Sequence, residues 1–478
     1  MVEYCWLFNM SAQPAASLHS ARQRSVDHST ASRPHESGRR FGIRDGLFYA
    51  VTQGGGEQYI SAFALLLHAT PFQLSVLSAI PQLFGTWAQL FSVKVSHWFP
   101  SRASQVFWGI IGQSVSWIPI LILPLLWPDQ GPWLLIAAVA VYFTFTHFTS
   151  PAWNSLITDL LEPNERGTYF ARRSRVIALT SFVTLCLAGV VLSFFELRQL
   201  LWVGFAIMFF LAGLSRSMSA VLLRNVHDLS QQEPSNNSTG FLVFFQTGMS
   251  EDFRHFLLFS GLMHAAVLVA GPFFVIYLLQ DLHLAHWQYG TWLAAGIIGQ
   301  FFTLPAWGQF GDRFGNKALL TFTGLLVALL PMLYLFNTAW LFLVTVNFFG
   351  GVVWAGLGLG LNNYVFDATQ PADRAKAVAI SSVVNAIGWA IGTMVGSILI
   401  GVVPARLQAG SLTLESASNL PFIFFLSGLF RLVVSATLLR TFHEPRQVEQ
   451  RAHHRLVWEL PLLKPLRQLS RRSTNANQ

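Results

Sequence analysis

The sequence predicts an all-α membrane protein with about twelve transmembrane helices, arranged as two pseudo-symmetric six-helix bundles. The composition, a series of long apolar segments and an internal repeat support this fold class. Of the 478 residues, 53% are hydrophobic and only 11% are charged, whereas soluble proteins carry about 25% charged residues. So little charge leaves too little polar surface to face water, and much of the surface must therefore face lipid.

The apolar segments are long enough to cross a bilayer as helices. A helix needs about 20 predominantly apolar residues to span ~30 Å of hydrocarbon. The alternating polar and apolar strands typical of a membrane barrel are not seen. The predicted spans are residues 43–68, 71–93, 105–127, 132–160, 168–195, 199–222, 253–280, 286–309, 317–336, 339–365, 375–402 and 420–441.

The basic residues indicate how the helices are oriented. If the N-terminus is cytoplasmic, the segments on the inner side hold 27 of the 30 Lys and Arg residues. Arg198 and Arg406 fall in outer loops, and Arg431 falls in the last span. Basic residues concentrate on the cytoplasmic side of membrane proteins. We therefore expect a multi-pass protein of the plasma (inner) membrane with both termini cytoplasmic, and the net charge of +8 does not indicate nucleic acid.

The predicted spans divide the chain into two bundles with polar segments around them. Residues 1–40 are polar after a short apolar start and contain no signal-peptide pattern, so we expect a disordered cytoplasmic tail. The expected boundaries are 1–40 for that tail, 41–224 for the N-terminal bundle, 225–252 for a cytoplasmic linker, 253–442 for the C-terminal bundle and 443–478 for a basic cytoplasmic tail.

Motifs for enzymatic chemistry are not found. The sequence contains no HExxH, GxSxG or P-loop pattern and no His/Cys metal cluster. Cys5 and Cys186 lie in the N-terminal tail and in a predicted span, which suits neither a disulfide nor a metal site. We therefore expect no catalytic residues, no cofactor and no metal. A membrane enzyme or sensor without a recognisable motif stays open as the alternative from another functional class.

An internal repeat relates the two halves. Residues 154–166 read NSLITDLLEPNER, and residues 362–374 read NNYVFDATQPADR. Asp159 and Arg166 of the first copy align without a gap with Asp367 and Arg374 of the second, 208 residues later. Proline disfavours helix at the preceding residue and suits the first turn of a helix, so each copy predicts the end of one span and the start of the next.

Each repeated aspartate would lie near a helix C-terminus, where the helix dipole disfavours negative charge. Each therefore needs a cation, and Arg166 or Arg374 is close in sequence. One interpretation is a static clamp of the turn. The other is a clamp that forms and breaks as the two halves rock, and the sequence leaves both open.

A loop in the second half carries a family resemblance. GQFGDRFGNK at 308–317 resembles the loop signature G-x-x-x-D-R-x-G-R-K of the major facilitator superfamily, with Asn316 where Arg is usual. The run RGTYFARRSR at 166–175 also resembles the start of the fifth helix in bacterial members. The matching positions of the loop are Gly308, Asp312, Arg313, Gly315 and Lys317.

The resemblance implies two six-helix bundles around a central cavity that opens alternately to each side of the membrane. In this family the signature loop meets a helix of the opposite half. We therefore expect Asp312 to approach Arg166, Arg172 or Arg173 when the inner gate is closed. The first-half copy of the loop, SHWFPSR at 96–102, is degraded and has His97 in place of the acid.

Glu57 is the first candidate for a substrate or proton site. Ionisable groups deep in a bilayer are costly, and are therefore functional candidates. Glu57 follows Gly54, Gly55 and Gly56 near the middle of the first span, and a weakened helix at mid-membrane is where transporters place substrate sites. The alternative is that the glycines permit close helix packing and Glu57 is a structural acid.

His264 lies 207 residues after Glu57, within one residue of the repeat offset. The two side chains are thus predicted to face each other across the pseudo-two-fold axis, where they could carry a proton. A hydrogen-bonded core histidine is the alternative. The other polar or aromatic candidates for the cavity are Gln53, His147, Gln300, Asn385 and Trp389.

The leading hypothesis is a secondary active transporter that moves a small polar organic solute, with protons as the possible coupling ion. Cavity residues that are mostly amides suit sugars or zwitterions better than multivalent ions. A drug or metabolite efflux antiporter is the alternative, although the Gly-Pro-rich fifth-helix motif of drug antiporters is missing from 174–195. We expect the chain to act as a monomer in the lipid bilayer, with a small-molecule substrate.

Overall fold

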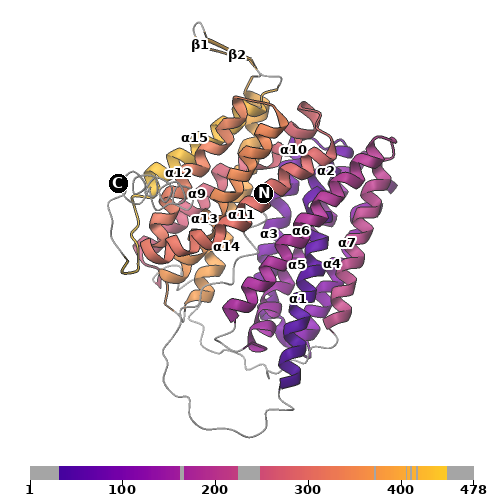
Figure 1. Cartoon of the computed structure of the whole chain (residues 1–478), viewed down its shortest axis with the longest axis vertical. Helices are drawn as coiled ribbons and strands as arrows, with labels where there is room; N and C mark the ends of the chain where they lie inside the picture. Colours follow the sequence, from indigo (N-terminus) through magenta and orange to yellow (C-terminus); the bar gives the residue numbers. More distant parts are fainter. Residues whose placement is uncertain are drawn as a thin grey trace, which may run out of the picture.

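The residues that the structure describes form helices, apart from one short hairpin and the connecting turns, as expected from the sequence. A computed structural model describes residues 32–161, 166–223, 248–370, 373–404, 406–409, 412–415 and 418–448. The helices of the N-terminal half gather on one side and those of the C-terminal half on the other (Figure 1). The hairpin lies in the sequence between the last two long helices, and it projects past the ends of the helices (Figure 1).

The N-terminal half contains six membrane-length segments, the first of which is broken. That segment consists of α1 (Ser32–Gly55), the 3₁₀ turn η2 (Glu57–Tyr59) and α2 (Ile60–Leu66). The others are α3 (Pro71–Lys94), α4 (Arg102–Leu126), α5 (Gly131–Asp159), α6 (Arg166–Glu196) and α7 (Leu201–Leu223), with the short turns η3 (Ser96–Trp98) and η4 (Pro128–Gln130) between them.

The C-terminal half repeats this pattern, and its first segment is broken as well. That segment runs through α9 (Glu251–Leu268), η6 (Gly271–Phe273), α10 (Phe274–Ile276) and the π-helical turn η7 (Tyr277–Asp281). The others are α11 (His286–Phe314), α12 (Asn316–Met332) with η8 (Leu333–Leu335), α13 (Trp340–Asp367), α14 (Arg374–Val402) and α15 (Leu420–Leu438). Strands β1 (Arg406–Ala409) and β2 (Leu412–Glu415) pair antiparallel between α14 and α15.

Helix starts follow the capping chemistry of the sequence. At α3, the Thr70 hydroxyl accepts a hydrogen bond from the Gln73 backbone N–H (3.2 Å), and the Gln73 side chain accepts one from the Thr70 N–H (2.9 Å). This reciprocal pair satisfies two backbone donors that a helix start leaves open. Ser101 caps α4 and Ser250 caps α9 in the simpler one-bond form.

The twelve predicted spans match the twelve membrane-length segments of the described residues. Nine of these segments are long and apolar enough to be identified by composition alone. The remaining three are the α1–α2 segment, α3 and α11. Of these, α3 packs on α14 and α11 packs on α6, across the boundary between the halves. Helices that face the other half or a cavity contact less lipid, which explains why these three are less apolar.

The repeat offset is not constant along the chain. The start of η2 at Glu57 is separated from the start of η6 at Gly271 by the same interval that separates α4 at Arg102 from α12 at Asn316. The interval between the starts of α6 and α14 is six positions smaller. The difference arises between α12 and α13, because the stretch from Asn316 to Asp367 is shorter than its first-half counterpart. The alignment of the repeated aspartates therefore holds for the fourth and fifth helices of each half and fails for the first.

The hydrophobic cores show where the halves join. One large cluster contains residues of both halves, among them Tyr59, Leu185 and Tyr289. The other clusters each belong to one half, such as the one around Trp153 and Leu156 and the one around Phe256 and Tyr364. The end of the molecule where α6 stops and α11 starts is therefore packed across the halves. We call it the outer side and the opposite end the inner side, following the predicted topology.

Helices α11 and α13 approach each other so closely that a glycine is required at the contact. A Cβ added to Gly351 would lie 1.8 Å from the Gly296 carbonyl oxygen, whereas nothing lies within 4 Å of one added to Gly401. We expect Gly351→Ala to lower the unfolding free energy by about 1–3 kcal/mol, the usual cost of overpacking. The matched change Gly401→Ala should leave thermal unfolding of the purified protein unchanged or raise its midpoint, and equal midpoints for the two variants would contradict the packing described.

Candidate functional site

A cavity of about 1290 Å³, including its opening, lies between the two halves. The broken first segment, α3 and α5 line it from the N-terminal half, and every segment of the C-terminal half contributes at least one residue. Its wall is largely apolar and aromatic, which is usual for organic-solute sites with few polar groups. The polar lining residues are Glu57, Gln58, Ser61, Ser78, Gln82, Asn347 and Arg431, and the aromatic ones are Phe143, Phe274, Tyr289, Trp292, Tyr334, Trp354 and Trp389.

Glu57 lines this cavity at the break between α1 and α2. Its carboxylate accepts a short hydrogen bond from the Tyr142 hydroxyl of α5, and only 6% of the residue is exposed. The preceding glycines also pack closely, since a Cβ on Gly54 would lie 2.4 Å from the Ser181 carbonyl oxygen and one on Gly56 would lie 2.4 Å from the Trp117 ring. The glycines therefore do both things considered from the sequence: they permit close helix packing, and they lie where the helix breaks.

His264 does not face Glu57. It lines a separate small cavity with Asn385, in the C-terminal half. Its Nδ1 lies 2.8 Å from the Ser260 carbonyl oxygen, and its ring stacks on Trp389 with centroids 6.5 Å apart. Trp389 lines the central cavity as well, so its indole stands between His264 and that cavity. The residue equivalent to Glu57 at the matching break is Gly271, and the predicted pairing fails because the offset of the repeated aspartates does not apply here.

Four other candidates do not appear in the lining of the central cavity. Gln53 is buried and accepts a hydrogen bond from the Ser181 hydroxyl of α6 (3.1 Å). His147 is buried against Gly85 of α3, where an added Cβ would lie 2.3 Å from its ring. Gln300 is half-buried on α11. Asn385 accepts a hydrogen bond from Ser260 (2.7 Å) at the smaller cavity.

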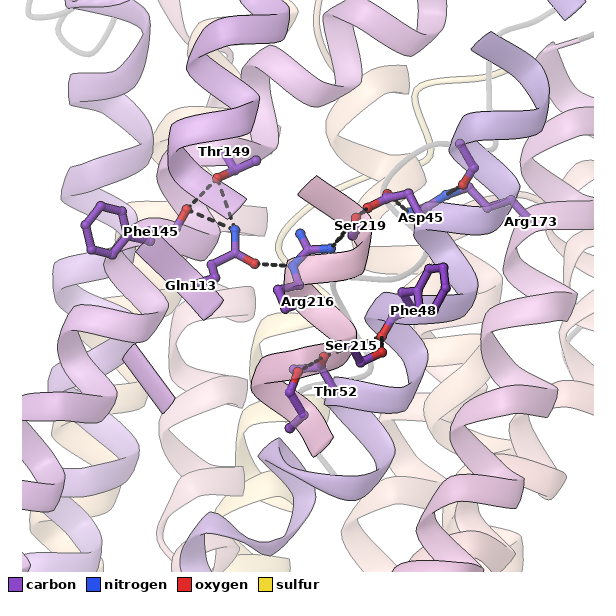
Figure 2. Close-up of polar contacts among 12 residues, drawn as sticks. Asp45, Phe48, Thr52, Gln113, Phe145, Thr149, Arg173, Ser215, Arg216 and Ser219 are labelled. Carbon is purple, nitrogen blue, oxygen red and sulfur yellow. Dashed lines mark hydrogen bonds and ion pairs between the residues drawn. The ribbon is translucent and has the colours of Figure 1, made fainter. Parts of the chain in front are cut away.

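A buried charge cluster in the N-terminal half was not predicted from the sequence. Figure 2 shows Asp45 of α1 facing Arg216 of α7 and Arg173 of α6. Arg216 Nη1 lies 3.0 Å from Asp45 Oδ1, Arg173 Nη2 lies 3.4 Å from Oδ2, and Ser219 donates a short bond to Oδ1. The exposed fractions of the Asp45 and Arg216 side chains are 2% and 6%.

The same cluster connects further helices of the N-terminal half. Arg216 Nε donates to Gln113 Oε1 of α4 (2.7 Å), and Gln113 Nε2 donates to Thr149 Oγ1 of α5 (3.1 Å; Figure 2). Arg173 also lies 4.1 Å from the centroid of the Trp153 ring. The sequence signal was present but ambiguous, because Asp45 and Arg216 fall near the predicted ends of their spans, where charges usually face water.

The repeated aspartates bind partners other than the predicted ones. Asp159 Oδ2 lies 2.6 Å from Nη1 of Arg102, the first residue of α4. The side chain of Arg166 lies outside the described residues. In the second half, Asp367 Oδ2 accepts a hydrogen bond from Asn316 (2.6 Å), the first residue of α12. Asn316 therefore stands where Arg102 stands in the first half.

The C-terminal segment supplies the cation that Asn316 lacks. Arg446 Nε lies 3.0 Å from Asp367 Oδ2, and its Nη2 donates to the Gly311 carbonyl (2.9 Å). Glu444 accepts a hydrogen bond from the Lys317 backbone N–H (2.8 Å). Arg374 begins α14, but its Nε has no hydrogen-bond partner in the described structure.

The signature loop turns at Gly315, whose φ of +93° favours glycine. Around it, Gly308 has room for a Cβ, and Arg313 lies 5.0 Å from the Phe314 ring. Asp312 and Arg172 are both exposed, and Arg173 is held by Asp45. Among the described residues no ion pair joins Asp312 to the fifth segment.

Two polar contacts join the halves on the outer side. His286 Nδ1 of α11 lies 2.9 Å from Glu196 Oε2 at the end of α6, and the Trp287 backbone N–H donates to Ser193 Oγ (2.9 Å). A Cβ on Gly290 would lie 2.5 Å from the Tyr59 hydroxyl, which marks the tightness of this contact. The described chain is thus closed on the outer side, whereas the inner-side pairs Arg102–Asp159 and Arg446–Asp367 each lie within one half.

The two kinds of ion pair should differ in their effect on stability. Asp45→Asn leaves Arg216 buried without its counter-charge, which should cost about 3–5 kcal/mol of unfolding free energy. The matched change Asp159→Asn affects a side chain that is 45% exposed and should cost about 1 kcal/mol or less. Unfolding of both variants in detergent, compared with the unmodified chain, measures the difference, and an Asp45→Asn variant as stable as Asp159→Asn would be inconsistent with the buried cluster.

Comparisons with known proteins agree with this fold. Residues 256–474 match the model of the Major Facilitator Superfamily. A mutant form of the nucleoside transporter NupG superposes with a TM-score of 0.66, covering 86% of this chain and 100% of that one at 12% identity. A bacterial homologue of the human lysosomal transporter Spinster, solved in an inward-facing and unoccupied conformation, gives a TM-score of 0.60, covering 89% and 100% at 15% identity.

Two curated proteins are similar over shorter stretches. Multidrug resistance protein 1 of Bacillus subtilis (strain 168) is 25% identical over 36% of this chain and 40% of its own length. Multidrug resistance protein 2 of the same strain is 28% identical over 26% of this chain and 31% of its own length. The chain thus matches less than half the length of these relatives.

Proposed function

We propose that the chain is a membrane transporter of the major facilitator superfamily and that it moves a small polar organic solute by alternating access through the central cavity. The observation that carries the proposal is the cavity itself, which lies between the halves and takes its lining from both. The distribution of basic residues favours an inner-membrane location with cytoplasmic termini.

The contacts between the halves support alternation between two states. On the outer side, the Glu196–His286 and Ser193–Trp287 contacts join α6 to α11. On the inner side, Asp159 and Asp367 pair within their own halves, and Asp312 is exposed. A rocking motion that separates α6 from α11 outside would bring Asp312 towards the fifth segment inside. We propose this contact, with Arg166 or Arg172, as the inner gate.

A reversible cross-link on the outer side tests the motion. The Ser193 hydroxyl lies 2.9 Å from the Trp287 backbone nitrogen, so cysteines at these two positions are near enough for a disulfide. We expect oxidised Ser193→Cys/Trp287→Cys protein in proteoliposomes to lose transport and to recover it with dithiothreitol. The two single variants serve as controls, and undiminished transport by the fully cross-linked protein would argue against alternating access.

We further propose that Glu57 carries the coupling proton. It is the only carboxylate among the described residues that line the central cavity, and it lies at the break in the first segment. An apolar cavity favours the neutral form of a carboxyl group, whereas the Tyr142 hydroxyl can donate to the charged form. The site can therefore hold Glu57 in either protonation state.

Glu57→Gln retains the size and hydrogen bonding of the side chain but removes its titration. We expect this variant to lose solute accumulation driven by a pH gradient while still exchanging or binding solute. Tyr142→Phe, which removes the neighbouring hydroxyl but leaves the carboxyl group, should keep accumulation and shift only its pH dependence. Accumulation by Glu57→Gln that still follows the pH gradient would exclude this carrier.

Efflux by solute/proton antiport is the second candidate. The aromatic wall of the cavity, with Trp292, Trp354 and Trp389, suits apolar organic compounds, and the curated relatives are named as multidrug resistance proteins. Right-side-out and inverted vesicles distinguish the two directions, because a symporter accumulates solute along the proton gradient and an antiporter accumulates it against that gradient.

A further inference from the structure

Arg431 is a buried arginine of α15 at the wall of the central cavity. Only 4% of the residue is exposed. Its Nη1 donates to the Val327 carbonyl (3.1 Å), and its Nη2 donates to the Ser427 hydroxyl (3.0 Å) and the Val267 carbonyl (3.4 Å). Among the described residues its Nε has no hydrogen-bond partner. Within the described residues no carboxylate lies within ion-pair distance, so a full positive charge is offset only by neutral oxygens.

The other half shows how the fold neutralises such a charge. Arg431 occupies the place of Arg216 by its contacts, since Arg216 of α7 binds Gln113 of α4 and Arg431 of α15 binds Val327 of α12. Val327 is aligned with Gln113 when η2 is paired with η6 and α4 with α12. Arg216 is held by the Asp45 carboxylate and by Gln113 (Figure 2). In the same alignment, the residues equivalent to Asp45 and Gln113 are Phe259 and Val327.

Because the second half has Phe259 and Val327 in place of Asp45 and Gln113, Arg431 lacks both side-chain partners that Arg216 has. Phe259 is fully buried and offers no acceptor. Val327 contributes only its backbone carbonyl, which accepts from Arg431 Nη1. The N-terminal half thus contains a closed ion pair, and the C-terminal half contains a corresponding arginine with the acid removed and the cavity beside it.

We propose that Arg431 is the anion receptor of the central cavity and that the transported solute is an organic acid with an apolar or aromatic body. An uncompensated charge within the membrane is costly and marks functional sites. A planar carboxylate matches the guanidinium fork and would satisfy the free Nε. The aromatic side chains of Trp354 and Trp389 line the same cavity and supply a surface for the apolar body of the solute.

The cavity limits what charge the solute carries. The Glu57 carboxylate, on the opposite half, is already bound by Tyr142, so a second anionic group on the solute would meet like charge there. A monocarboxylate, alone or with a protonated amine as in a zwitterion, therefore fits better than a dianion. This inference rests on the proposed transport through the central cavity and specifies its substrate class.

Matched acid and amide probes test the proposal on the unmodified protein. We expect benzoate and indole-3-acetate to raise the thermal unfolding midpoint of purified full-length protein, while benzamide and indole-3-acetamide leave it unchanged. Benzoate binding should weaken by about tenfold or more in Arg431→Gln, the loss of one strong charge-assisted contact. Arg431→Lys should retain part of the affinity, and Arg198→Gln, on an outer loop, should retain all of it.

The outcomes separate this inference from the proposed function. If amides bind as well as acids, or if folded Arg431→Gln binds benzoate as the unmodified chain does, the assignment of Arg431 is overturned and transport of another solute class stands. If no acid binds, the assignment is likewise overturned. If acids bind through Arg431 but proteoliposomes do not transport them, the receptor stands and the proposed transport fails. The acid–amide comparison needs no variant, so it decides the matter even if Arg431→Gln does not fold.

Discussion

The need to neutralise every charge inside the membrane governs this structure. Charges in hydrocarbon are costly, and each must find a partner or face a polar cavity. Asp45, Arg216 and Arg173 meet this requirement together in the N-terminal half, with hydrogen bonds that extend to α4 and α5. Glu57 meets it through Tyr142 at the cavity wall. Arg431 has only neutral oxygens around it, and this difference between the halves identifies the part of the cavity where a charged solute would bind.

The N-terminal half is thereby expected to be the more rigid of the two bundles, because one ion cluster connects α1, α6 and α7. The C-terminal half is secured at its inner end instead. There Arg446 and Glu444 bind the signature loop and Asp367, which replaces the Arg102–Asp159 pair of the first half. In both halves the repeated aspartate binds an arginine, but in the second half that arginine is Arg446, which follows the last helix. Such a clamp within one half leaves the halves free to move against each other.

Much of the fold could be predicted from the sequence, because helix length and apolar composition are set by bilayer thickness. The twelve spans, the break after the glycines 54–56 and the helix ends at Asp159 and Asp367 all follow from local patterns. The partners of the ionisable side chains could not be predicted from local patterns. Asp45 and Arg216, for example, are 171 residues apart, and a single sequence gives no direct measure of such contacts. The pairing of Glu57 with His264 failed for a related reason. The second half is shorter between the start of its third helix and the end of its fourth, so one offset cannot align both ends of the repeat.

A distance measurement across the inner side tests alternating access most directly. Spin labels at Arg175 of α6 and Gln309 of α11, both exposed and on opposite halves, can be introduced after Cys5 and Cys186 are replaced by serine. In lipid nanodiscs between pH 5 and pH 8, with and without benzoate, we expect two distance populations. The longer one corresponds to the structure described, with its outer side closed, and the shorter one to a state in which the inner ends have come together. A single population that no pH or solute changes would contradict the account.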